Sequence, residues 1–150
     1  MSNWTAISID SLKAAGHGAL VDAAQTAGVG GVDPVAESIA DAVSRVRAAC
    51  STGNQLDADV TRVPNSLKGL AIRVALYALM ERIGYSLSED QRDTRRNDNS
   101  MLLRINDDKL RFETPDMPAG DAEMQAGDGM ETITRTQREA YTRRGMDGLL

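Results

Sequence analysis

The sequence predicts a mainly α-helical protein: a small helical bundle with a short β or extended element and a long C-terminal arm. Two stretches, residues 33–51 and 63–84, repeat apolar side chains at the spacing of a helix. A third helical stretch follows a capping sequence near residue 88. From residue 113 the composition becomes acidic and rich in glycine and proline, which is typical of a linker. We therefore expect a helical domain over residues 1–112 and an extended docking arm over residues 113–150.

The composition limits both the size of the core and the kinds of partner. A chain of 150 residues corresponds to about one domain, and only 3% of these residues are aromatic. Because large rings supply much of the buried area in a small core, we expect neighbouring subunits to complete this one. The net charge of -5 disfavours binding to duplex DNA, which normally requires a basic face.

Cysteine content and hydropathy exclude further classes of protein. Cys50 is the only cysteine, which rules out an intrachain disulfide and a cysteine-based zinc site. Residues 1–12 lack the basic and apolar regions of a signal peptide. No apolar run approaches the ~20 residues that span a bilayer. The sequence therefore predicts a soluble protein made in the cytoplasm, with no membrane partner.

The N-terminal region predicts two short helices. Residues 8–15 form the first helix, with Ser8 or Asp10 as its cap and Gly16 as its stop. The alanine-rich residues 18–27 form the second helix.

The two central helices have the clearest patterns. Over residues 33–51 one apolar stripe is formed by Val35, Ile39, Val43, Val46 and Cys50. The next helix opens at Val63-Pro64, because proline is tolerated at the first helical position, and it ends at Gly84. Apolar residues cover so much of its circumference that we expect this helix at the centre of the bundle.

The following helix begins with a strongly charged segment. Ser88 and Gln91 have the spacing of a capping box. Arg92, Arg95 and Arg96 alternate with acids, which is typical of a solvated face and also marks a candidate subunit interface. Beyond this helix, polar and apolar residues alternate over residues 107–112, which predicts a short strand or extended edge.

A glycine-rich stretch raises the question of a nucleotide site. Residues 26–34 read TAGVGGVDP, but they lack the lysine and hydroxyl residue of a Walker loop and the third glycine of a dinucleotide loop. Asp33 has the position of an N-cap, where its carboxylate would occupy the place of a phosphate. Pro34 removes one N–H group from the same helix start. We interpret the stretch as a turn and a helix cap.

Other residues whose side chains could act in catalysis or bind a metal also have a simpler structural interpretation. His17 lies between two glycines with no nucleophile motif nearby, and Cys50 falls on the apolar stripe of its helix. The acid pairs at residues 57/59 and 107/108 lack the spacing of an EF-hand, so we expect solvated loop acids. The sequence therefore predicts no catalytic residue, no cofactor and no metal, and the protein is expected not to be an enzyme.

The end of the predicted arm differs from its beginning. Residues 113–131 contain acids and no base, whereas the tail beyond them is basic and carries apolar anchors. This pattern is typical of a docking peptide, and the β-branched run at 131–136 is suited to adding a strand to a partner sheet. The candidate partner-docking residues are Ile133, Arg135, Arg138, Tyr141, Arg143, Arg144 and Met146.

The order of these features resembles a known family. A short opening helix is followed by Val32-Asp33-Pro34, a helix of the type ESIADAVSRVRAA, and Val63-Pro64 leading into SLKGLAIRVALYALMER. Over about residues 7–112 the chain resembles the head-tail connector (adaptor or neck) proteins of tailed bacteriophages, in particular those of Mu-like phages and prophages.

The resemblance implies a structural virion protein in the neck, between the capsid portal and the tail. Such proteins are helical bundles that form a ring, commonly dodecameric, below the portal. The ring extends the DNA channel and joins the head to tail-proximal neck or tail-terminator proteins. DNA would pass without sequence-specific binding, and an acidic wall would avoid sticking to phosphate.

Two other functions stay open on the sequence alone. One is a prophage-encoded helical DNA-associated regulatory protein, whose nearest candidate for a basic helix, residues 91–96, is diluted by acids. The other is an enzyme with a nucleotide site at residues 28–31. Salt-dependent retention on DNA would favour the first alternative, and nucleotide binding that is lost on mutating Gly30 would favour the second.

Overall fold

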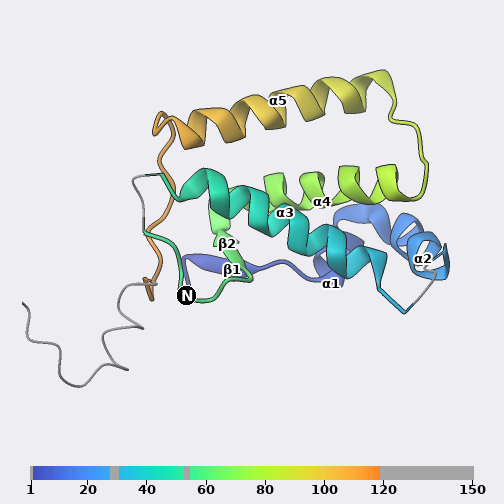
Figure 1. The fold of residues 1–150 in the computed structure, drawn as a ribbon, viewed down its shortest axis with the longest axis horizontal. Coiled ribbons are helices and arrows are strands. Elements are labelled where there is room, and N and C mark those ends of the chain that lie inside the picture. The colour runs from blue at the N-terminus through green and yellow to red at the C-terminus, as the bar shows by residue number, and fades with distance from the viewer. Residues whose placement is uncertain (1, 28–30, 53–54, 119–150) are drawn as a thin grey trace, which may run out of the picture.

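A computed structural model describes residues 2–27, 31–52 and 55–118 and confirms a mainly helical fold with one small sheet (Figure 1). Within the described chain no helix combines the length and the apolar character needed to cross a membrane. The element bounds are β1 Trp4–Ala6, α1 Ile9–Leu12, a π-helical segment Lys13–His17, α2 Gly18–Ala27, α3 Pro34–Cys50, β2 Arg62–Pro64, a 3-10 turn Asn65–Leu67, α4 Lys68–Arg82 and α5 Glu89–Asn106.

The predicted helix caps are confirmed. The Ser8 side chain accepts a hydrogen bond from the first turn of α1, and Asp33 caps α3 by accepting from the Val35 amide at 2.9 Å. Ser88 and Gln91 form the expected capping box at the start of α5. These side chains satisfy N–H groups that have no partner within their own helix, so each fixes where its helix begins.

The first two helices meet at a kink rather than at a loop. Gly16 has a φ of +90° and lies inside the π-helical segment that joins α1 to α2. A side chain at this position would be strained in the left-handed region, although no atom crowds the space beside it. Gly16 therefore interrupts the helix as predicted, while the chain stays wound on both sides of it.

The pair α3 and α4 forms the centre of the molecule (Figure 1). As the apolar stripe predicted, Val35, Val46 and Cys50 of α3 have no exposed surface. Helix α4 buries side chains around most of its circumference, which confirms its predicted central place. Its buried residues are Leu70, Ala71, Val74, Ala75, Leu76, Tyr77, Leu79 and Met80.

The small sheet corrects one predicted helix start. Strand β1 pairs antiparallel with β2, and Trp4 lies opposite Pro64. Pro64 therefore belongs to a strand rather than to the first turn of a helix, and α4 begins only at Lys68. Proline is acceptable here because β2 is an edge strand, whose outward side needs no N–H donor.

Helix α5 covers the opposite side of α3 and α4 from the sheet (Figure 1). It buries only Asp98 and Ile105, and Asp98 forms a two-pronged ion pair with Arg73 of α4 at 2.7 and 2.9 Å. After α5, residues 107–112 form a turn and irregular chain, so the short strand that was one of the two forms predicted there is wrong. Their alternating apolar residues, Leu110 and Phe112, pack on the core without a strand partner.

Candidate functional site

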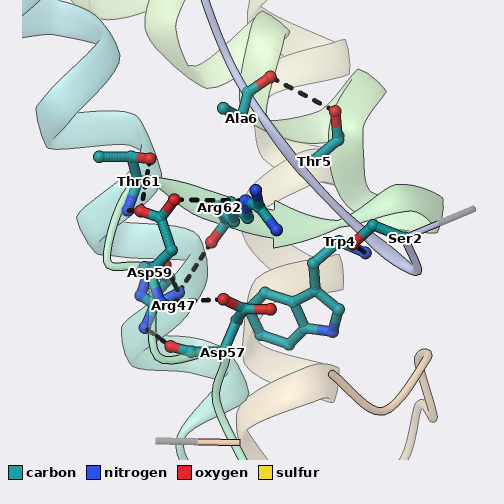
Figure 2. A network of polar contacts seen from close by, with 9 residues as sticks. All are labelled: Ser2, Trp4, Thr5, Ala6, Arg47, Asp57, Asp59, Thr61 and Arg62. Carbon is teal, nitrogen blue, oxygen red and sulfur yellow. Dashed lines mark hydrogen bonds and ion pairs between the residues drawn. The ribbon is translucent and has the colours of Figure 1, made fainter. Parts of the chain in front are cut away.

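A single arginine organises the loop between α3 and β2 (Figure 2). Arg47 of α3 donates hydrogen bonds to the backbone carbonyls of Asp57 at 2.8 Å, Asp59 at 3.0 Å and Arg62 at 2.8 Å. Its guanidinium also lies 5.6 Å from the centre of the Trp4 ring, within range of a cation–π contact. Arg47 therefore holds residues 57–62 against α3 and the sheet.

Two acids of this loop have different environments. Asp59 is half-exposed, and hydrogen bonds from the hydroxyl and amide of Thr61 lower the pKa of its carboxyl. Asp57 is 2% exposed, which corrects our expectation of a solvated acid at this position. Its Oδ1 accepts from the Asp59 amide at 2.9 Å, and its Oδ2 is buried and has no hydrogen-bond partner among the residues that the structure describes. No group of three metal-binding side chains occurs within the residues that the structure describes.

Residues 113–118, the first part of the predicted arm, contact the helical domain. The indole Nε1 of Trp4 donates to the carbonyl of Glu113 at 2.9 Å, and the Trp4 ring meets Phe112 edge to face. The Ala58 amide donates to the Met117 carbonyl at 2.8 Å, and Pro118 forms an isolated bridge with Asp57. The chain therefore leaves the described structure beside the loop that Arg47 holds.

An apolar groove opens beside the same loop. It has a volume of about 810 Å³ and lies between α3, residues 7–10 and residues 60–61; we call it the α3 groove. Val60 at its edge is 72% exposed, whereas Val43 in its wall is 5% exposed. The lining includes Ile7, Ile9, Ile39, Val43, Arg47 and Val60.

A second hollow, of about 590 Å³, lies between α3, α4 and α5 and is lined by charged side chains of both signs. Arg82 of α4 forms ion pairs with Glu37 and Asp41 of α3. Arg95 of α5 pairs with Glu81 of α4. The charges that face this hollow therefore largely neutralise one another, and they clamp the three helices together.

The structure separates the three arginines of the candidate subunit interface. Arg95 is partly buried and points toward α4, where its ion pair belongs to the fold. Arg92 and Arg96 are exposed on the outer side of α5, and Arg96 also pairs with Asp93 at 3.2 Å. Arg92 and Arg96 thus remain available to a partner, while Arg95 acts within the domain.

Other predicted residues occupy the positions expected of structural groups. Cys50 is fully buried, and burial raises the pKa of its thiol to about 12 although Arg47 acts in the opposite direction. His17 is half-buried in the kink between α1 and α2. Gly31 has a φ of +82° just before the α3 cap, as a turn requires, and residues 28–30 lie outside the described residues. The seven docking residues predicted between 133 and 146 also lie outside them.

Comparison with protein-family models, with curated proteins and with solved structures finds no match to this chain. The functional proposal therefore rests on the sequence and on the geometry of the structure. Sequence reasoning took Asp57 for a solvated loop acid, and it missed the role of Arg47 and the α3 groove, because these features are brought together by contacts between distant segments. The sequence pattern placed Arg47 mostly off the apolar stripe of its helix, which gave no indication of this role.

Proposed function

We propose that this protein is a structural connector of a tailed-phage virion. In this role a dodecameric ring of it lies below the portal, extends the DNA channel and joins the head to the tail. Its partners are further copies of itself, the portal protein and tail-proximal neck or tail-terminator proteins. Viral DNA passes through without sequence-specific contacts, in keeping with the net charge of -5.

The observation that carries the proposal is the place where the arm leaves the domain. Residues 113–118 are fixed by hydrogen bonds to Asn3, Trp4, Ser66 and Ala58, so the following chain starts from a defined point. The basic, apolar tail then acts as a docking peptide on the portal or on an adjacent subunit. A helical domain from which the arm extends at one fixed position is suited to linking parts of a particle.

The outer side of α5 supplies a second candidate contact between subunits. Arg92 and Arg96 stand one helical turn apart on an exposed surface, where they are placed to meet acids of a neighbour. Ion pairs at the rim of an interface contribute orientation more than affinity. We therefore assign these arginines a role in aligning neighbouring subunits in the ring.

Deleting residues 132–150 tests the proposal. The truncated protein should keep the helical circular-dichroism signal and cooperative unfolding of the full chain, since the contacts described above end at Pro118. It should no longer join portal particles in a sedimentation assay. A full-length variant with Arg135, Arg138, Arg143 and Arg144 replaced by glutamine separates the charge of the tail from its length. Normal joining by the truncated protein would refute the docking role, and salt-sensitive retention on DNA would favour a regulatory protein.

A further inference from the structure

We propose that the α3 groove of one subunit binds residues 132–146 of an adjacent copy, the basic segment of the arm that carries its apolar anchors. The inference rests on the proposed function, because it identifies the surface that receives the arm within the ring. It makes each subunit both donor and acceptor, through two different patches of its surface. Head-to-tail contacts of this kind can close into a ring, whereas a self-complementary patch closes as a dimer.

The α3 groove has the properties of an acceptor for apolar side chains. Ile39 is only partly buried, and Val60 extends from the edge with 72% of its surface exposed. Arg47 keeps its positive charge, but its guanidinium is held by the loop and the sheet, because it donates to three carbonyls and lies 5.6 Å from the centre of the Trp4 ring. A volume of about 810 Å³ accommodates several side chains, and filling it would remove apolar surface from water.

The tail of this chain has the complementary chemistry. Ile133, Tyr141 and Met146 are apolar residues separated by polar ones, so only a few side chains need to enter an apolar groove. Residues 132–150 carry four arginines against two acids, whereas residues 1–118 carry sixteen acids against thirteen bases. At the groove itself, Asp10 in the lining is an exposed acid that can receive an arginine at the rim, and Asp59 next to Val60 is a second exposed acid that already pairs with Arg62 at 3.2 Å.

The length of the intervening chain favours a neighbouring copy. Pro118 pairs with Asp57, three positions before Val60, so the subunit's own groove is about 10 Å from the exit point. Residues 119–132 contain four acids and no base, and like charges along a linker repel one another. Fully stretched it spans roughly 45 Å, and a domain of this size has a diameter of about 35 Å. Residues 119–132 are therefore long enough to reach the equivalent groove of the next subunit.

Disulfide trapping between full-length chains tests this arrangement. Val60→Cys would be mixed with Ile133→Cys, Tyr141→Cys or Met146→Cys in turn, and then oxidised at concentrations that support assembly. The native Cys50 should not form a disulfide, because its thiol is fully buried and the pKa of that thiol is raised to about 12. We expect a Val60-to-arm heterodimer for at least one pairing. Absence of heterodimer in all three, or a double variant that forms only an intramolecular bridge, would overturn the inference.

A matched pair of groove variants supplies the second measurement. Ala40 lines the α3 groove and Ala48 lies outside it, and both are exposed on α3, so glutamate is tolerated by the fold at either position. Ala40→Glu should lower the trapped yield about tenfold because it places a charge in an apolar site, while Ala48→Glu should leave it unchanged. Equal yields for the two variants would contradict the assignment of the groove.

The same variants separate this inference from the proposed function. If the arm docks on the portal alone, Ala40→Glu will join portal particles normally and no heterodimer will form, which overturns the groove assignment but not the connector role. If chains cross-link but never join portal particles, the groove assignment holds and the connector role fails.

Discussion

Replacing Arg47 by alanine should destabilise the domain more than replacing any neighbouring surface arginine. The change removes three hydrogen bonds to the carbonyls of residues 57, 59 and 62 and the contact with the Trp4 ring. At about 1 kcal/mol for each hydrogen bond and about 0.5–1 kcal/mol for the cation–π contact, the free energy of unfolding should fall by roughly 3–4 kcal/mol. Arg47→Lys keeps the charge but not the fork of donors, so it should lose about 2 kcal/mol.

Urea unfolding followed by circular dichroism at 222 nm measures these losses. For a slope of about 1–3 kcal/mol per molar urea, the midpoint of Arg47→Ala should fall by more than 1 M. Arg45→Ala is the control, because Arg45 is exposed on the same helix and makes none of the hydrogen bonds described here. A change within about 0.5 kcal/mol for that control is expected. If Arg47→Ala loses no more than Arg45→Ala, the loop is not organised as we describe.

Three further substitutions probe other parts of the fold. Asp98→Asn weakens the ion pair with Arg73, whose side chain is 43% exposed. It should lower the free energy of unfolding by roughly 2 kcal/mol in the same urea assay. An unchanged free energy of unfolding would contradict a stabilising role for this ion pair. Gly16→Ala forces alanine into the left-handed region at a φ of +90°, and calorimetry should detect a loss of about 1–2 kcal/mol, whereas a gain would contradict the kink. Burial acts to raise the pKa of Glu113, but hydrogen bonds from Ser66 outweigh it and the pKa lies below the usual 4.5. The contribution of Glu113 to the free energy of unfolding is therefore present above pH 4.5 and lost as the pH falls through the folded pKa. Glu113→Gln should make the free energy of unfolding depend less steeply on pH in the acid range. An unchanged dependence on pH in that range would exclude this role.

Local signals in the sequence predicted the helical part of the fold well. Ser8, Asp33 and Ser88 act on N–H groups within the next three residues, so their role as caps depends on little beyond the neighbouring chain. The burial of α4 also followed from its own composition. These features were predictable because each is decided by residues that are close in sequence.

Long-range contacts decided the features that the sequence did not reveal. Pro64 looks like a helix start, but pairing between β1 and β2, about sixty positions apart in the chain, places it in a strand. Residues 107–112 alternate like a strand, yet strand character requires a partner, and this segment packs through Leu110 and Phe112 instead. The hydrogen bonds of Arg47 end on backbone carbonyls, which leave no side-chain pattern to detect.

We propose that this domain is a scaffold completed by copies of itself, with the tail fixed on a neighbour. Electron cryomicroscopy of particles assembled with the full-length chain tests it most directly. We expect a closed ring below the portal, with density for residues 132–146 in the α3 groove of the adjacent subunit. Particles whose necks lack this protein, while it persists in the host as a monomer, would contradict the account.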